Sequence, residues 1–244
     1  MADQTAAAAP AAPPRKGFPS RLVGVFVSPG ETFEEIARRP TVLAPMLLLA
    51  VGFGVVSYLI APIQGKEAAE FTAKSSFFER IPEAQREEIL EAQRNPSPAR
   101  RAISAVGGPA AVIVIVLFFS LLLWGLGHLL GGEPTFKGVL SIELFASMVS
   151  VLANFLVKLP FILSRQTFSG VTFSPAAFLA DAPVTSTAFR LLALLDLFAL
   201  WGVIVGGIGF ARVSRLSTST GIAVQAVLYG IAGAVTFAVQ SFFM

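Results

Sequence analysis

The stretch PAAVIVIVLFFSLLLWGLGHLL, residues 109–130, contains no Asp, Glu, Lys or Arg. An α-helix rises 1.5 Å per residue, so about 20 apolar residues cross the roughly 30 Å hydrocarbon core of a bilayer. A stretch of this length and composition is typical of a transmembrane helix. Four more apolar stretches qualify, at residues 42–63, 139–163, 189–211 and 220–243. The sequence therefore predicts an all-α, polytopic integral membrane bundle of five transmembrane helices.

The composition of the whole chain also indicates a membrane protein. Of 244 residues, 55% are hydrophobic and 14% are charged, whereas soluble domains carry roughly 25% charged residues. The chain has no cysteine and one histidine, His128, which excludes disulfides and cysteine-ligated metals, so no metal site or cofactor is expected. The net charge is +3, but Lys and Arg flank the apolar stretches and do not form one basic patch, so nucleic acid binding is not expected.

Three regions follow from this pattern. Residues 1–17, an Ala/Pro tract without the features of a signal peptide, are expected to be a disordered tail. Residues 18–40 form an amphipathic juxtamembrane segment, which we call the collar. Residues 41–244 form the five-span membrane domain. A polar loop at 64–105, with a helix expected from Pro82 to Arg94, separates the first two spans.

The collar carries clear helix signals. Ser28, Pro29 and Glu31 fit an N-cap, a first-turn proline and a capping-box acid, and Pro40 ends the helix. One face carries Phe33 and Ile36. The other carries two acid–base pairs four residues apart, Glu34 with Arg38 and Glu35 with Arg39. We expect an interfacial helix in the headgroup region, with a solvated juxtamembrane helix as the alternative.

The distribution of basic residues favours a cytoplasmic N-terminus. Five Lys or Arg residues precede the first span and three follow it within twenty residues. An odd number of spans then places Met244 outside. The lipid bilayer is the one partner that composition requires.

Four segments occur in a familiar order: VFVSPGETFEEIARRPTVLAPMLLL, IPEAQREEILEAQ, LLLWGLGHLLGGEPTFKGVLSIELFAS and LLALLDLFALWGVIVGGIGFARVSRLS. From about residue 20 onward the chain resembles bacterial members of the Yip (Ypt-interacting-protein) family of five-span membrane proteins. The resemblance implies a non-enzymatic protein that organises membrane or recruits a protein partner at the cytoplasmic face, here in the bacterial inner membrane. Eukaryotic members are implied in membrane traffic and bind Rab-type GTPases through a long cytosolic N-terminal region. This chain lacks that region, so the GTPase partner is not carried over.

A stripe of polar residues runs along the third span. Its members are spaced 4, 3, 4 and 4 residues apart, which confines them to an arc of about 80°: Glu143, Ser147, Ser150, Asn154 and Lys158. A charge at mid-bilayer costs about 3 kcal/mol, so this face should contact other helices. Glu143 and His128 lie at a similar predicted depth in the membrane, and so do Lys158 and Asp196. We therefore expect these residues to form two pairs, Glu143 with His128 and Lys158 with Asp196.

The stripe allows two interpretations. In the first, its residues stabilise helix packing through hydrogen bonds worth about 0.6 kcal/mol each. In the second, the protein is a small ion or solute transporter in which Glu143 or Asp196 exchanges protons or binds a cation. Transporters usually show internal repeats or broken helices, and the sequence shows neither, Pro160 and Gly-rich segments being the only hints of irregular backbone. The first interpretation is therefore favoured.

Small residues predict close helix contacts. Gly202 and Gly206 form a GxxxG motif on the fourth span, and Ala226, Gly230 and Ala234 form a ridge on the fifth. We expect these helices to pack together within the chain, with homo-oligomerisation as the alternative.

Enzymatic activity is not expected. The segment GLGHLL, residues 125–130, lacks the third glycine of a dinucleotide-binding fingerprint, and no Walker, HExxH or GxSxG motif is present. Asp196 is the single Asp within a predicted span, which argues against paired intramembrane aspartates.

Overall fold

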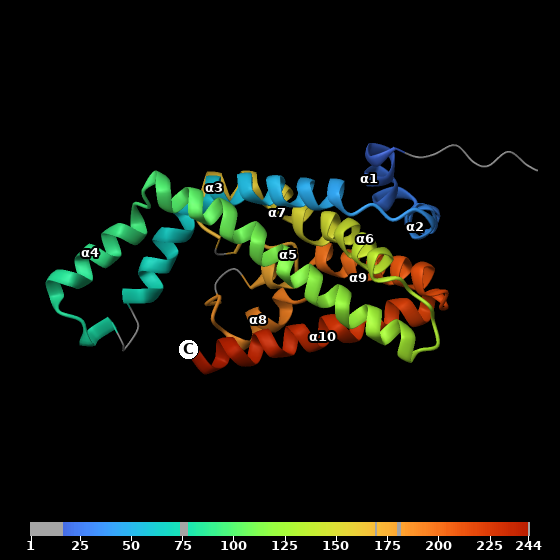
Figure 1. Cartoon of the computed structure of the whole chain (residues 1–244). Helices are drawn as coiled ribbons and strands as arrows, with labels where there is room; N and C mark the ends of the chain where they lie inside the picture. Colours follow the sequence, from blue (N-terminus) through green and yellow to red (C-terminus); the bar gives the residue numbers. More distant parts are fainter. Residues whose placement is uncertain (1–16, 74–77, 169, 180–181, 244) are drawn as a thin grey trace, which may run out of the picture.

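The computed structural model describes residues 17–73, 78–168, 170–179 and 182–243, which form helices and connecting loops without a strand (Figure 1). The tail predicted for residues 1–17 lies outside the described residues, except for Gly17.

Five spans cross the length of the molecule, as predicted. The first is α3 (Leu43–Ala73), the second α5 (Pro98–Leu129) and the fifth α10 (Thr218–Phe243). The third and fourth spans are composite. The third contains α6 (Phe136–Ser147), η2 (Met148–Ala153) and α7 (Asn154–Arg165), and the fourth contains α8 (Thr187–Ala193) and α9 (Leu197–Ser214).

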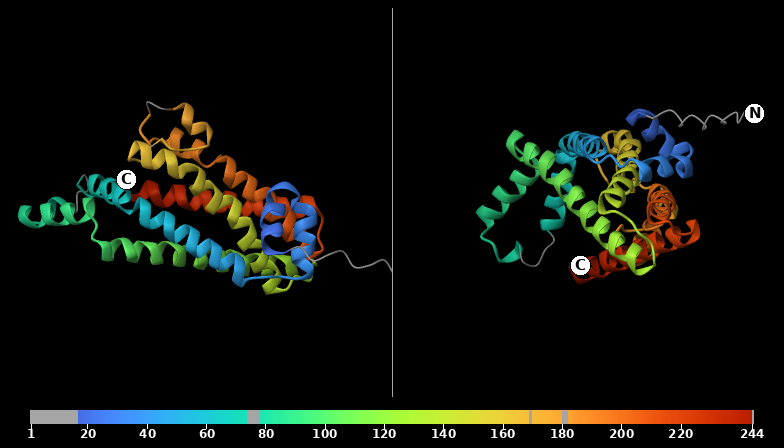
Figure 2. Two further views of the ribbon diagram at one scale, coloured as in Figure 1. Left: turned by 90° about the horizontal axis from the view of Figure 1, so that it is seen from above. Right: turned by 45° about the vertical axis from the view of Figure 1, so that its right-hand side comes forward.

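The third span forms the centre of the bundle. Of its most apolar window, 61% is buried by the protein, compared with 6% for α10 at the edge. The α6 helix packs against α3, α5 and α9, whereas α10 packs chiefly along α9 (Figure 2). The third span carries the fully buried residues Ile142, Phe145 and Val149 at helical spacing. These residues explain its central position, because the same span also carries polar residues. Burying the polar face removes it from lipid.

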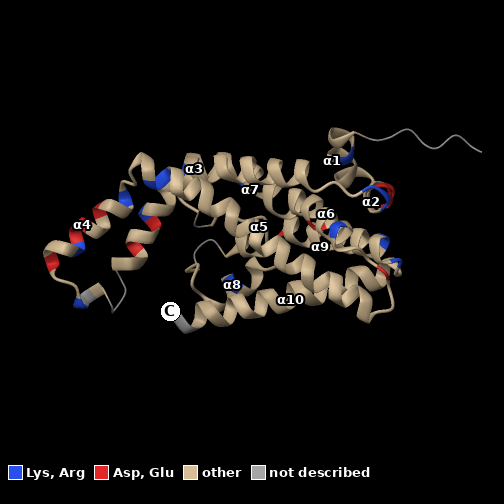
Figure 3. Ribbon diagram, in the orientation of Figure 1, with Lys and Arg blue, Asp and Glu red and all other residues tan. Residues whose placement is uncertain are grey.

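A polar extension lies beyond one end of the bundle. Helix α3 has 31 residues and is therefore about 46 Å long, which exceeds the hydrocarbon core. It connects through η1 (Phe78–Arg80) to α4 (Glu83–Arg94), the helix expected from Pro82. Glu67 in the extended part of α3 accepts hydrogen bonds from Thr167 Oγ1 and Phe168 N, both at 2.6 Å. Charged side chains gather at the two ends of the molecule, as a membrane-spanning bundle requires (Figure 3).

Two spans have an irregular backbone that hydropathy and helix signals do not predict. The third span passes through a π-helical segment, η2, between α6 and α7. The fourth span covers the predicted stretch 189–211 but is interrupted at 194–196, so it is not one continuous helix. Pro160 lies inside α7 without interrupting it. A wider π-helical turn changes which side chains face a neighbour and is frequent at functional sites.

The collar consists of α1 (Phe18–Val27) and α2 (Pro29–Arg38). Helix α2 begins at Pro29 as predicted, but the Ser28 side chain makes no capping hydrogen bond, so the predicted side-chain cap is wrong. Glu34 and Arg38 form the expected ion pair. Glu35 instead pairs with Arg21 of α1 at 3.2 Å, which corrects the expected pair with Arg39. Arg21 reaches Glu35 because the two short helices fold against each other.

Candidate functional site

The apolar face of the collar is docked on the protein. Phe33 and Ile36 are fully buried in a core cluster with Ile142, Phe145 and Val205. The expectation that this face inserts among lipid headgroups is therefore wrong. The physical reason is that α6 and α9 present a matching apolar surface, so the collar buries its side chains without entering the lipid.

A glycine permits this close approach. A Cβ added to Gly209 of α9 would lie 2.4 Å from Ile142 Cγ2 and 3.0 Å from Phe33 Cδ1. Both distances are shorter than van der Waals contact. The missing side chain at Gly209 therefore creates the space in which Phe33 packs.

Polar contacts fasten the collar at its turn into the first span. The guanidinium of Arg21 is buried and donates from Nη1 to the Arg39 carbonyl oxygen at 3.0 Å, besides its contact with Glu35. Thr41 N donates to Ser141 Oγ at 3.1 Å, and Ser141 Oγ donates to the Thr41 carbonyl oxygen at 2.8 Å. The collar is therefore held to α6 by hydrogen bonds as well as by apolar packing.

The opposite face of the collar is charged and exposed. It carries the acids Glu31 and Glu34 followed by the bases Arg38 and Arg39, so both signs of charge lie side by side on it. Exposed bases from two other elements that pack against α2 are Lys137 at the start of α6, and Arg212 and Arg215 at the end of α9. Figure 3 shows charged residues of α2, α6 and α9 at this end of the molecule. The result is a surface of mixed charge in a fixed position beside the membrane domain.

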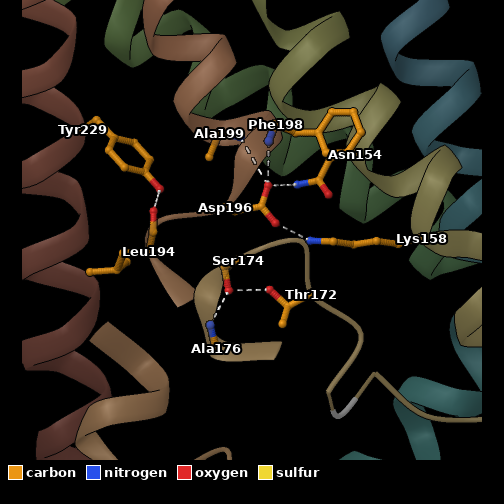
Figure 4. A network of polar contacts seen from close by, with 10 residues as sticks. All are labelled: Asn154, Lys158, Thr172, Ser174, Ala176, Leu194, Asp196, Phe198, Ala199 and Tyr229. Carbon is orange, nitrogen blue, oxygen red and sulfur yellow. Dashed lines mark hydrogen bonds and ion pairs between the residues drawn. The ribbon is translucent and has the colours of Figure 1, made fainter. Parts of the chain in front are cut away.

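The polar stripe of the third span divides into two clusters. In the first, Asp196 Oδ2 accepts from Lys158 Nζ at 2.8 Å, the pair predicted from depth (Figure 4). Asp196 Oδ1 accepts from Asn154 Nδ2 at 3.2 Å. It also accepts from the backbone N–H groups of Phe198 and Ala199 at 3.0 and 3.3 Å, which makes Asp196 the N-cap of α9. This capping role was missed, although an Asp that precedes an apolar helical run is a recognisable N-cap signal.

In the second cluster, Glu143 binds a partner that the sequence reading overlooked. Glu143 Oε1 accepts from Gln225 Nε2 of α10 at 2.6 Å. His128 is exposed, and its Nδ1 lies 2.8 Å from the Trp124 carbonyl oxygen on its own helix. The predicted pair Glu143 with His128 is therefore wrong. Gln225 could have been found as a polar side chain near the start of the fifth span, at a depth similar to that of Glu143 near the start of the third.

The two serines of the stripe do not join the clusters. Ser147 Oγ donates to the Glu143 carbonyl oxygen at 2.8 Å, and Ser150 Oγ donates to that of Ala146 at 3.3 Å. Each hydroxyl group therefore donates its hydrogen bond within the third span, and the expectation that these hydroxyls bridge helices is wrong. The side chain of Ser150 instead packs against α9, where a Cβ on Gly202 would lie 2.5 Å from Ser150 Cβ.

Helices α9 and α10 make close contact at glycines. Of these, Gly206 was predicted from the sequence, whereas Gly207 and Gly221 were not. A Cβ on Gly206 would lie 2.9 Å from Gln225 Nε2, and one on Gly221 would lie 2.2 Å from the Gly207 carbonyl oxygen. The ridge of Ala226, Gly230 and Ala234 is exposed. A Cβ on Gly230 would meet no atom within 4 Å, so this ridge does not make the expected contact with the fourth span.

A cavity of about 380 Å³ opens beside the Glu143 cluster. It lies between α5, the third span, α9 and α10. Its polar lining comes from Glu143, Ser147, Ser150, Gln225 and Tyr229, and apolar walls come from Val112, Ile115, Phe119, Leu228 and Ala232 among others. In the described ranges, no group of three or more His, Cys, Asp or Glu side chains could hold a metal ion.

Similarity to known proteins assigns this architecture to a family. The model of the Yip1 domain matches residues 23–239, which include the second half of α1, all of α2, the first four spans and all but the end of α10. The chain belongs to the Yip1 domain family. This Yip1-domain protein is 25% identical over 210 residues to "Membrane protein YknW" of Bacillus subtilis (strain 168), in an alignment that covers 86% of this chain and 85% of the relative. No solved structure matches it. Family membership supports a non-enzymatic membrane protein.

Proposed function

We propose that this Yip1-domain protein has no chemistry of its own and recruits a protein partner to the membrane through the exposed face of its collar. The observation that carries the proposal is the docking of Phe33 and Ile36 into the bundle core. A helix whose apolar face is already buried presents its polar face in one position, which lowers the entropic cost of binding a partner.

The charge pattern favours protein over lipid as the binding partner. A surface that binds anionic lipid is usually a cluster of Lys and Arg. The collar instead carries the acids Glu31 and Glu34 beside the bases Arg38 and Arg39. A mixed pattern provides specificity toward a partner with the complementary arrangement of charges.

We further propose that the collar lies on the cytoplasmic side of a bacterial inner membrane and that the C-terminus lies outside. The basic residues before the first span favour this orientation. The other polar end, with α4, would then face the exterior. The face available to a cytoplasmic partner comprises the collar and the bases near Lys137 and Arg212.

Site-directed photo-crosslinking in cells tests the proposal. A photoreactive amino acid replaces Glu34 on the collar, and a control chain carries it at Glu88, an exposed position on α4 at the opposite end. The proposal expects a discrete protein adduct from position 34 that is absent from position 88. It also expects the adduct to decrease when Phe33→Ala loosens the collar. Identical adducts from both positions, or none from position 34, would contradict it.

A small ion or solute transporter is the second candidate, because the cavity holds a carboxyl group beside a π-helical turn. The other carboxyl group of the stripe, Asp196, has four hydrogen-bonding partners and fits a structural role better. Proton or cation flux in liposomes distinguishes the candidates. Transport predicts flux that Glu143→Gln abolishes, whereas recruitment predicts no flux above that of empty liposomes.

A further inference from the structure

The cavity beside Glu143 has the polarity and position of a lipid site. We propose that it binds one membrane lipid with a primary-amine headgroup, whose ammonium group donates hydrogen bonds to Glu143 while an acyl chain lies along the apolar walls. This site is separate from the exposed face of the collar, so the inference goes beyond the proposed recruitment function.

Glu143 lies just below the level of the lipid headgroups, within reach of a headgroup amine. The third span, Phe136–Arg165, has 30 residues and is therefore about 45 Å long, close to a bilayer with its headgroups. Glu143 lies seven residues after the start of α6, and Gln225 lies seven residues after the start of α10. Both are therefore about 10 Å from the membrane surface, near the boundary between headgroups and hydrocarbon.

The surroundings of the cavity point to an occupant from the bilayer. Its walls include α5 and α10, whose outward residues Ile115, Val227 and Ile231 are each more than half exposed and apolar. Helix α10 packs chiefly along α9, and α5 packs along α3 and α6, so neither covers the other. Exposed apolar helices on both sides place the opening toward lipid acyl chains.

The hydrogen-bonding capacity of the lining selects the headgroup. Ser147 and Ser150 use their protons on backbone carbonyls, and Glu143 Oε1 already accepts from Gln225. Tyr229 Oη donates to the Leu194 carbonyl oxygen. The groups left to a ligand are therefore mainly acceptors, including the second carboxylate oxygen of Glu143, and the remaining donor is the second N–H of the Gln225 amide. Among the described lining residues, Glu143 is also the one charged side chain. A primary ammonium supplies both the complementary charge and three N–H donors, whereas a trimethylammonium supplies charge alone.

Native mass spectrometry of the full chain, delipidated in detergent, provides the test. Phosphatidylethanolamine and phosphatidylcholine with identical acyl chains are titrated separately. We expect wild type to bind the ethanolamine lipid about tenfold more tightly, as hydrogen bonds to a charged group imply. Glu143→Gln should remove this preference. The control Glu133→Gln alters an exposed carboxylate in the loop before α6 and should retain it. Equal affinity for the two lipids in wild type, or an unchanged preference in Glu143→Gln, would overturn the proposal.

A second pair of variants tests the location without touching the polar residues. Ala232→Leu reduces the cavity volume, whereas Ala223→Leu adds the same side chain at an exposed α10 position outside the cavity. The proposal expects loss of ethanolamine-lipid binding in the first variant alone. Binding that persists in Ala232→Leu would place the lipid elsewhere. A protein dimer that Ala232→Leu dissociates would show that a second copy occupies the cavity, which would also overturn the proposal.

Discussion

At the scale of the residue, Asp196 combines two structural tasks. It caps α9 and pairs with Lys158, whose side chain is only 16% exposed. Asp196→Ala should lower the free energy of unfolding by about 3–5 kcal/mol, because it leaves a buried ammonium group unpaired. Asp196→Asn should cost less, since Asn is an equally good N-cap. Unfolding by sodium dodecyl sulfate in mixed micelles measures both changes.

A control for this prediction is available on the collar. Glu34→Ala breaks an ion pair in which both side chains are more than half exposed. Its effect on the free energy of unfolding should be within about 1 kcal/mol, because solvent screens exposed pairs. The account of Asp196 would be wrong if its alanine variant were as stable as the Glu34 variant.

Two glycines provide a matched comparison. Gly209→Ala places a methyl group within 2.4 Å of Ile142 and should destabilise the docked collar by about 1–3 kcal/mol. Gly230→Ala meets no atom within 4 Å and should keep or slightly raise stability through its higher helix propensity. The same micelle titration measures both, and equal stabilities would show that Gly209 does not control packing. A change of oligomeric state in Gly230→Ala would instead favour an intermolecular role for the exposed ridge.

A side-chain pair could be predicted from the sequence where similar depth in the membrane was enough to identify the two residues. Lys158 and Asp196 lie at similar depth on neighbouring spans, and they pair. Glu143 and His128 also share a depth, but the pairing fails because hydropathy does not give the rotation of a helix about its axis. The true partner, Gln225, is uncharged, so charge complementarity does not identify it.

At the scale of the element, the collar shows what periodicity can and cannot predict. The spacing of Phe33 and Ile36 correctly identifies an apolar face, and Pro29 correctly marks the start of α2. Periodicity does not say whether that face meets lipid or protein. The answer depends on residues more than 100 positions away, such as Ile142 and Gly209.

Docking of the collar predicts protection from protease. Phe33→Ala removes a fully buried ring and should cost about 3–5 kcal/mol of local stability, so α2 would separate from the bundle more often. Tryptic cleavage between Arg38 and Arg39 should then accelerate in limited digestion. Phe26→Ala on α1 is the control, because that ring is 37% exposed and lies outside the core cluster. Equal cleavage rates in these two variants would argue against docking.

The irregular parts of the third and fourth spans could not be read from hydropathy. A π-helical turn such as η2 preserves helical composition, and the break at 194–196 interrupts an apolar run at one Asp. Both features lie where the third and fourth spans pack together. They arise from tertiary contacts such as Asn154 with Asp196, which local sequence does not encode.

At the scale of the whole molecule, the five-span architecture could be predicted because hydrocarbon thickness constrains helix length and composition directly. All five predicted stretches overlap a helix able to span a bilayer. The packing order could not be predicted, since the second, fourth and fifth spans have similar composition. Which spans are central depends on the polar face of the third span and on glycine contacts such as Gly202 with Ser150.

The proposed orientation leads to a labelling prediction. The chain has no cysteine, so single cysteines can be introduced without background. In intact cells, Glu88→Cys on α4 should react with a membrane-impermeant maleimide, and Glu34→Cys on the collar should react only after the inner membrane is permeabilised. The reverse pattern would invert the topology and would place the proposed recruitment face outside the cytoplasm.

The docked collar is a fixed part of the membrane domain. Spin labels at Glu31→Cys on α2 and Lys137→Cys on α6, both exposed, allow pulsed electron paramagnetic resonance to measure the distance between them in lipid nanodiscs. The account predicts a single narrow distance distribution that broadens when Phe33→Ala is added. A broad distribution in the chain that retains Phe33, unchanged by that substitution, would show a collar that moves independently of the bundle and would contradict the account.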